Sequence, residues 1–247
     1  MEASNSKSLN KFISETGICS RREADRYIEA GRVKINGQIA VKGNRVEEGD
    51  LVLLDDKPLN SKPGFIYIAY HKPVGITCTT DPKDPTNILD AIRHPERIFP
   101  IGRLDKDSEG LIFLTNDGDI VNKILRAGNQ HEKEYIVTVD KPITNSFIKK
   151  MSAGVPILDT VTQPCFVRKE SQVVFRIILT EGLNRQIRRM CSFFGYRVVR
   201  LVRVRIMNVH LGNLKTRHWR VLSPKEMQTM EKLLVNSKKT AEKRRQE

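Results

Sequence analysis

The chain has 247 residues, with 43 Lys and Arg against 29 Asp and Glu and a formal net charge of +14 at pH 7. A chain of this length can bury a full hydrophobic core, as one large domain or two smaller ones. Its four cysteines contain no C-x-x-C pair, and no apolar run approaches the roughly 20 residues of a membrane span. We therefore expect a cytoplasmic protein with neither disulfides nor a membrane segment.

Residues 7–54 predict a small domain of two helices and a short sheet. The run Ser20-Arg21-Arg22-Glu23 is a capping box that starts the second helix. Arg21 and Arg22 then lie on the first turn, where unpaired backbone N–H groups and the helix dipole favour an anion. We expect this corner to bind phosphate. A helix-turn-helix that reads duplex DNA is the competing interpretation, but it lacks a polar base-reading face beyond the two arginines.

A hairpin follows the second helix, because Asn36-Gly37 among alternating apolar residues is a type I′ turn signal. Residues 55–64 are polar, contain two prolines and show no periodicity, which predicts a linker. Residues 65–235 then predict a larger domain with more strands than helices and no regular β-α-β alternation. The expected fold class is therefore α+β, with a large, mainly antiparallel mixed sheet in the second domain.

An acid-bearing loop at residues 103–110 lies between an apolar run and a strand predicted at residues 111–114, with Asp105 at its apex. A carboxylate on a loop between two strands is held by a rigid scaffold and can still face a substrate. On these residues alone, a hairpin loop whose Asp and Ser satisfy the turn backbone is an equally good interpretation.

The sequence predicts neither a metal site nor a nucleotide-binding loop. The pairs Asp105/Asp107 and Asp117/Asp119 lack a supporting His or Glu at ligand spacing, and Asp117 suits a helix cap. The five histidines form no H-x-x-x-H set. Neither G-x-G-x-x-G nor G-x-x-x-x-G-K-[ST] occurs, so no nucleotide cofactor is expected.

Positive charge is concentrated in the last third of the chain. Residues 176–247 contain 18 Lys or Arg and 5 Asp or Glu, and Arg185, Arg188 and Arg189 form a stripe on a predicted helix. Such a surplus is an electrostatic footprint for a polyanion, although a solvated basic surface without a partner stays open. The charged tail at residues 236–247 lacks apolar anchors and is expected to be disordered.

Two predicted strands carry polar side chains among apolar ones. Residues 135–139 alternate strictly, so Tyr135 shares a face with the two valines that follow. On the strand predicted at residues 198–209, the same alternation places Arg203 and Arg205 on one face.

The run Gly102-Arg103-Leu104-Asp105, followed by Gly110-Leu111, resembles the catalytic signature of the pseudouridine synthases. Residues 9–54 resemble an S4 RNA-binding domain. Together the matching segments cover nearly the whole chain in the arrangement of the small-subunit-type branch of the family. Three further matches stand in the expected order: His71-Lys72-Pro73-Val74-Gly75, Lys133-Glu134-Tyr135 and Gly182-Leu183-Asn184-Arg185-Gln186-Ile187-Arg188-Arg189-Met190.

The resemblance implies an enzyme that converts uridine to pseudouridine without a cofactor, by breaking the N1–C1′ bond and rejoining the base through C5. Asp105 would attack C1′ or take the C2′ proton, and the sequence leaves both open. Arg188 would keep Asp105 ionised. Tyr135 would stack on the uracil and take or relay the C5 proton, while Arg103 would fill the space left by the flipped base.

The implied substrate is structured RNA: 23S rRNA near the peptidyl-transferase region, with a tRNA anticodon arm as a competing or additional target. The protein is expected to act as a monomer. A non-catalytic RNA-binding ribosome-assembly factor is the alternative; an acid-pair glycosidase is more distant, because Asp105 has no obvious carboxyl partner. The residues expected to contact RNA are Ser20, Arg21, Arg22, Lys34, Asn36, Arg185 and Arg189.

Overall fold

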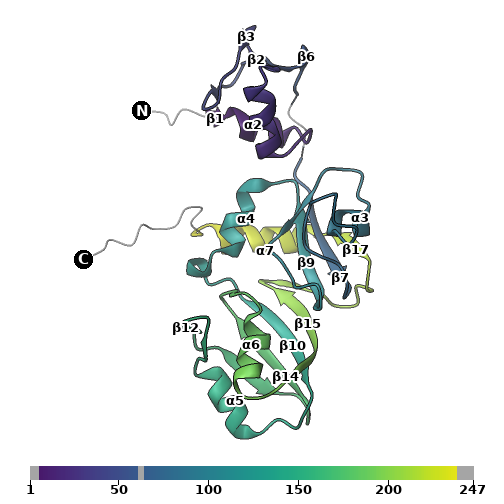
Figure 1. Cartoon of the computed structure of the whole chain (residues 1–247), viewed down its shortest axis with the longest axis vertical. Helices are drawn as coiled ribbons and strands as arrows, with labels where there is room; N and C mark the ends of the chain where they lie inside the picture. Colours follow the sequence, from purple (N-terminus) through teal and green to yellow (C-terminus); the bar gives the residue numbers. More distant parts are fainter. Residues whose placement is uncertain (1–5, 61–63, 238–247) are drawn as a thin grey trace, which may run out of the picture. The chain divides into compact units, whose positions relative to one another are not determined.

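The computed structural model describes residues 6–60 and 64–237 (Figure 1). The chain forms two compact units, one built from residues up to Phe65 with Pro95–Arg97, and the other from Ile66–His94 and the residues after Arg97. No helix among the described residues is long and apolar enough to cross a membrane. The tail expected to be disordered, residues 236–247, lies outside the described residues except for its first two.

The smaller unit consists of two helices and short strands. Its strands form a four-stranded sheet in the order β3-β2-β5-β6 and a separate pair, β1-β4. The side chains of both helices and of β2, β4 and β5 meet in one hydrophobic cluster. The elements are β1 (Lys7–Ser8), α1 (Leu9–Glu15), α2 (Arg21–Glu29), β2 (Val33–Ile35), β3 (Gln38–Ile39), β4 (Arg45–Val46), β5 (Val52–Leu54) and β6 (Lys57–Pro58).

The capping box and the hairpin turn expected in the smaller unit are both confirmed. The Ser20 hydroxyl accepts a hydrogen bond from the Glu23 N–H, and the Glu23 carboxylate accepts one from the Ser20 N–H. Asn36 and Gly37 have φ values of 50° and 82°, as a type I′ turn requires. The helix start and the hairpin register therefore follow from local sequence.

Part of the segment expected as a linker, residues 55–64, belongs to the small sheet. β6 pairs with β5 across a turn in which Asp55 and Asp56 both have positive φ. Pro58 made this strand hard to predict, because proline cannot donate a hydrogen bond to a neighbouring strand. It is tolerated here because β6 is the edge strand of the sheet.

The larger unit is built around a mixed sheet in the order β13-β14-β10-β15-β9-β7-β17, with β8 and β16 paired to its side. Every neighbouring pair is antiparallel except β15 and β9, which confirms the α+β class with a mainly antiparallel sheet. Strands β11 (Pro156–Ile157) and β12 (Thr160–Val161) form a separate pair. The strands of the large sheet are β7 (Tyr67–Lys72), β8 (Phe99–Ile101), β9 (Glu109–Thr115), β10 (Lys133–Val139), β13 (Phe166–Lys169), β14 (Val174–Leu179), β15 (Val198–Ile206), β16 (Val209–His210) and β17 (Trp219–Val221).

Helices cover the two ends of this sheet separately. Figure 1 shows α5 and α6 beside β10, β14 and β15, where they share one hydrophobic cluster, and α4 and α7 beside β9, where they share another. A third cluster joins α3 to β7 and β9. The helices are α3 (Ile88–Ile92), α4 (Gly118–Leu125), α5 (Asn145–Ser152), α6 (Gln186–Phe193) and α7 (Pro224–Leu234), with a 3-10 turn at Ala127–Asn129.

The parallel contact between β9 and β15 joins the two ends of the sheet. It pairs Val202 with Glu109 and Arg203 with Gly110. Gly110 has a φ of +112°, and a Cβ there would lie 2.3 Å from the Arg203 carbonyl oxygen. Only glycine allows this approach, which brings the end of the Asp105 loop against β15.

A bulge in β15 changes which residues share a face. Glu134 pairs with Arg205 but the next residue, Tyr135, pairs with Arg203, so Val204 is an extra residue in the ladder. Neighbouring residues of β10 point to opposite faces, and their partners follow them. The expectation that Arg203 and Arg205 share one face was therefore wrong, because strict alternation does not continue through a bulge.

Candidate active site

A cavity of about 760 Å³ lies in the larger unit, where the loop between β8 and β9 meets β10, β15 and the start of α6. Ligand sites commonly have volumes of about 300–1,000 Å³. The lining includes all four residues that the sequence analysis expects to be catalytic: Arg103, Asp105, Tyr135 and Arg188. Segments far apart in the sequence thus meet at one concave site.

The loop that carries Asp105 is fixed by its backbone. The Asp105 carbonyl accepts a hydrogen bond of 3.0 Å from the Ser108 N–H, which closes a turn, and the Lys106 carbonyl accepts one of 2.7 Å from the Gly75 N–H. Ser108 is fully buried. The Asp105 side chain is 31% exposed, so it can meet a ligand while its backbone stays in place.

Arg185 faces both carboxylates of this loop. It donates two hydrogen bonds to Asp107, of 3.1 and 2.8 Å, and its Nη1 lies 3.8 Å from Asp105 Oδ2. Arg185 precedes α6 with a left-handed φ of 50°, which turns its side chain away from the helical stripe expected for it. Its hydrogen bonds, together with the charge of Arg188, lower the pKa of Asp107.

Arg188 binds the loop backbone. Its Nη2 donates to the Asp107 carbonyl at 2.8 Å and to Ser108 Oγ at 3.2 Å, and its Nη1 donates to the Val198 carbonyl at 3.3 Å. The expected ion pair with Asp105 is not found among the described residues, because the first turn of α6 directs this guanidinium beneath the loop. Among those residues, Asp105 pairs with Arg185.

Tyr135 and Arg103 occupy different parts of the cavity. Tyr135 is 9% exposed and lies between Arg203 on β15 and Ile177 on β14. Arg103 is exposed at the start of the loop. The cavity thus combines a nearly buried aromatic ring with a solvent-accessible guanidinium.

Three buried cations surround this side of the site: Lys72, Lys133 and Arg203. Lys72 donates to the Pro73 and Ile76 carbonyls, and burial lowers its pKa. Burial, followed by the charge of Arg203, lowers the pKa of Lys133 to about 8. Arg203 was not predicted as a site residue, although an arginine among strand valines is a signal for a special position.

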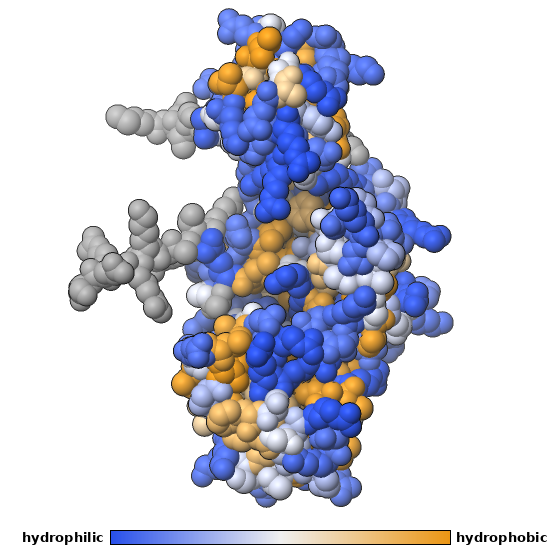
Figure 2. Space-filling view, in the orientation of Figure 1, coloured by the Kyte–Doolittle hydropathy of each residue, from blue (hydrophilic) through white to orange (hydrophobic). Residues whose placement is uncertain are grey.

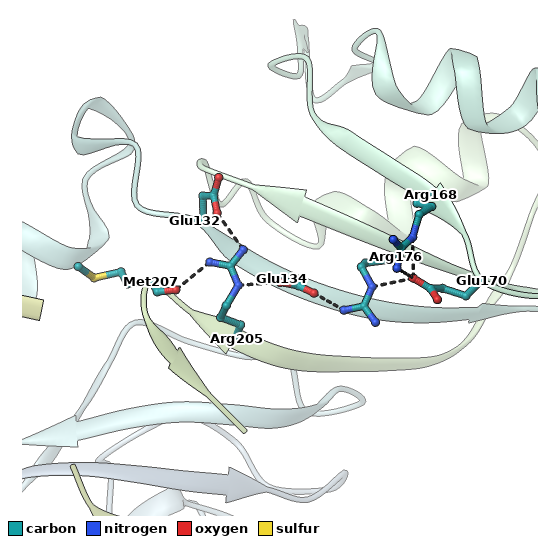
Figure 3. Close-up of polar contacts among 7 residues, drawn as sticks. All are labelled: Glu132, Glu134, Arg168, Glu170, Arg176, Arg205 and Met207. Carbon is teal, nitrogen blue, oxygen red and sulfur yellow. Dashed lines mark hydrogen bonds and ion pairs between the residues drawn. The ribbon is translucent and has the colours of Figure 1, made fainter. Parts of the chain in front are cut away.

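The opposite face of the same strands carries a chain of ion pairs (Figure 3). Glu134, next to Tyr135, pairs with Arg176 of β14 and with Arg205 of β15. Burial opposes ionisation of Glu134, but hydrogen bonds from both arginines outweigh it and lower the pKa of this carboxyl. Glu134 is therefore neutralised by two arginines on the face of the strands away from the cavity.

The residues expected to contact RNA lie in both units. In the smaller unit, Arg21 and Arg22 are exposed on the first turn of α2. Lys34 forms an ion pair with Asp56, and Asn36 donates to Asp50, while the Ser20 hydroxyl caps α2. In the larger unit, Arg189 is exposed and donates to Asn184, and Figure 2 shows hydrophilic and hydrophobic residues side by side on the face of this unit.

Metal ligation is not evident from the described residues, whose His, Cys, Asp and Glu side chains form no group of three that could hold an ion. All four cysteines are free thiols, and burial raises the pKa of Cys191 to about 12 and that of Cys165 to about 11. These thiols are protonated at neutral pH and are poor nucleophiles.

Comparison with protein families identifies two regions. Residues 66–193 match the model described as RNA pseudouridylate synthase, and residues 8–52 match the S4 domain. The solved structure described as a crystal structure of pseudouridylate synthase aligns with a TM-score of 0.67 and 28% identity, covering 90% of this chain and 99% of that one.

Two curated proteins illustrate the range of similarity. The dual-specificity RNA pseudouridine synthase RluF of Escherichia coli (strain K12) is 59% identical over 231 residues, which are 93% of this chain and 80% of that protein. The ribosomal large subunit pseudouridine synthase B of Bacillus subtilis (strain 168) is 30% identical over 239 residues, which are 93% of this chain and 98% of that protein.

Proposed function

Since this chain belongs to the RNA pseudouridine synthase family and carries an S4 domain, we propose that it isomerises a specific uridine in structured RNA with Asp105 as the reacting carboxylate. The observation that carries the proposal is the position of Asp105. It lies on a loop whose backbone is fixed by hydrogen bonds, and together with Tyr135 of β10 it lines the cavity. A carboxylate that reacts with a sugar carbon must be accessible and oriented before the substrate arrives.

The reaction conserves every atom. The N1–C1′ bond breaks and its electron pair stays on the uracil, while Asp105 either bonds to C1′ or takes the C2′ proton. The base then turns and C5 bonds to C1′, while the Asp105–C1′ bond breaks or Asp105 returns the C2′ proton. C5 loses its proton and N1 gains one, so the product has the atoms of the substrate. Nothing is oxidised or reduced, so this chain needs no cofactor for the step.

Tyr135 and Arg103 have complementary roles in this proposal. The Tyr135 ring stacks on the uracil and takes or relays the C5 proton, and its burial among strand side chains supports a fixed orientation. The exposed Arg103 fills the space in the RNA stem that the flipped uridine leaves. Base flipping is least costly in a loop, a bulge or a distorted stem, which favours structured RNA with weak local stacking.

We propose 23S rRNA as the main target and a tRNA anticodon arm as a second one. The E. coli relative is named a dual-specificity enzyme and the B. subtilis relative a large-subunit enzyme, which supports both targets. The S4 domain, with Arg21 and Arg22 at the start of α2, supplies RNA affinity outside the catalytic unit. The protein acts as a monomer, because the proposed site lies within one unit of one chain.

The test is an incubation of the purified protein with 23S rRNA fragments and, separately, with tRNA, without any added cofactor. One uridine should become stably reactive with carbodiimide, as pseudouridine is, while the RNA mass stays unchanged. Conversion of rRNA but not tRNA would limit the target to rRNA. Tight binding without conversion of either RNA would contradict the proposal and favour a binding factor.

A further inference from the structure

Arg203 is a buried arginine in the central strand β15. It is only 5% exposed, yet it lines the cavity on the same face of the sheet as Tyr135. Its Nε donates a hydrogen bond of 2.6 Å to the Leu111 carbonyl. Its Nη2 is buried and has no hydrogen-bond partner in the described part of the chain. Buried donors are nearly always satisfied, so this nitrogen is suited to an acceptor that arrives with a ligand.

The charges near Arg203 favour an acceptor with negative charge. Lys133 and Lys72 are also buried, and the charge of Arg203 helps to lower the pKa of each, after the larger effect of burial. The charges of the two loop carboxylates act on Lys72 in the opposite direction, but both carboxylates are partly exposed and Asp107 is held by two hydrogen bonds from Arg185. The Arg203 side of the cavity therefore has an excess of buried positive charge.

The reaction in "Proposed function", on which this inference rests, produces a matching negative charge. When the N1–C1′ bond breaks, its electron pair passes to the uracil and is delocalised over N1 and the two carbonyl oxygens. We propose that Arg203 Nη2 donates a hydrogen bond to a carbonyl oxygen of the uracil and stabilises this anion as the bond breaks.

The geometry of the strand pair supports this contact. Tyr135 and Arg203 are cross-strand partners on one face, and the Cβ atoms of such partners lie about 5 Å apart. A base stacked on the Tyr135 ring therefore has an edge close to the guanidinium. Fixed donors aimed at a developing charge in a buried site are among the strongest catalytic effects.

A purely structural role makes different predictions. Through Leu111 the guanidinium also joins β15 to β9, beside the close contact of Gly110 with the Arg203 backbone. If Arg203 served only this purpose, its loss would reduce stability but would not depend on how easily the base leaves. The test must therefore vary the leaving group as well as the protein.

The variants are Arg203→Met and Arg203→Lys, with Arg205→Lys as a matched control. Arg205 lies two residues away on the other face, where it pairs with Glu132 and Glu134 (Figure 3), and lysine keeps that charge. Arg203→Met should lower kcat by about 10²–10³-fold, the loss typical of one oxyanion donor. Arg203→Lys should lose less, and Arg205→Lys should keep the wild-type kcat. Melting curves and RNA affinity are measured for each variant.

The decisive comparison uses RNA with 5-fluorouridine at the target position. Fluorine makes the uracil anion more stable, so a missing donor matters less. The single-turnover loss of the N-linked nucleoside should show a smaller effect of the Arg203 substitution on fluorinated than on ordinary RNA. An equal effect on the two RNAs would overturn the inference.

The outcomes separate this inference from the proposed function. If the wild-type protein converts no uridine, the proposed function fails. If it converts uridine and folded Arg203 variants keep the wild-type kcat, only the role of Arg203 is overturned. Should Arg203→Met fail to fold, Arg203→Lys carries the same fluorouridine comparison, because one ammonium group cannot reproduce both guanidinium contacts.

Discussion

Arg185 holds Asp107 through two hydrogen bonds of 3.1 and 2.8 Å and also lies 3.8 Å from Asp105. Arg188, three residues later, binds the backbone of the same loop. Both guanidinium groups therefore lie near the Asp107 carboxylate, since Arg188 Nε is 3.3 Å from Asp107 Oδ2, but Arg188 also fixes the backbone of the loop.

Because only Arg188 binds the loop backbone, substitutions of the two arginines should have different consequences. Arg188→Met should lower the free energy of unfolding by about 1–3 kcal/mol, because the Asp107 and Val198 carbonyls lose their donor. Arg185→Met should cost less than about 1 kcal/mol, because its ion pair is largely exposed. Urea unfolding and kcat are measured for both. Equal losses of stability would contradict the assignment.

Gly110→Ala should be among the most destabilising single substitutions. The added Cβ would lie 2.3 Å from the Arg203 carbonyl oxygen, at a φ of +112° that alanine rarely adopts. We expect a loss of about 3 kcal/mol. Gly128→Ala is the control, because a Cβ there meets no atom within 4 Å, and it should stay within about 0.5 kcal/mol of the wild type. Thermal or urea unfolding measures the stability of both variants, and equal stability of the two would contradict the prediction.

Stability should depend on pH through Glu226. This carboxylate caps α7 at Ser223 and accepts two hydrogen bonds from Arg220, which lower its pKa from 4.5 to about 2. Because the folded-state pKa is the lower one, the stabilisation is complete above pH 4.5 and is lost as the pH falls toward 2.

Glu226→Gln should therefore lower the free energy of unfolding by roughly 2 kcal/mol at neutral pH. The gap between this variant and the wild type should close as the pH falls below 4.5. Urea unfolding from neutral pH down to about pH 3 measures it. A gap that does not change with pH would show that the cap does not depend on the charge of Glu226.

The smaller unit should contribute to the salt dependence of RNA binding. Replacing Arg21 and Arg22 together by glutamine removes two exposed cations at the start of α2. The slope of log affinity against log salt should become shallower by about 1–2, because fewer counterions are released. Arg26→Gln, on the last turn of the same helix, is the control and should leave the slope unchanged. An unchanged slope for the double variant would remove this corner from the RNA interface.

Local signals predicted much of this fold because they depend on few residues. The capping box at Ser20, the Asn36-Gly37 turn and the α+β class with a mainly antiparallel sheet were all predictable. The bulge at Val204 was not, because it depends on how β15 pairs with β10 and not on alternation within β15. Strand β6 was missed because its proline and polar residues are typical of a linker.

The candidate site was predictable as a set of residues but not as a set of contacts. The order of the motifs indicated that Asp105, Tyr135 and Arg188 belong to one site, and all three line one cavity. The pairing of Asp105 with Arg185 depends on the left-handed backbone at Arg185, which no periodic pattern indicates. Arg203 could not be predicted as a site residue, because the bulge places it on the face of Tyr135 and Arg205 on the other face.

The central claim is that Asp105 is the reacting carboxylate, and Asp105→Asn tests it most directly. Asn keeps the size of the side chain and much of its hydrogen bonding, so folding and RNA affinity should stay close to those of the wild type. Asp107→Asn is the matched control on the same loop and should be slower but still active. Target RNA is incubated with each protein, and pseudouridine is mapped by carbodiimide labelling. The account predicts conversion by the wild type and by Asp107→Asn, and none by Asp105→Asn. Pseudouridine formed by Asp105→Asn above background would contradict it.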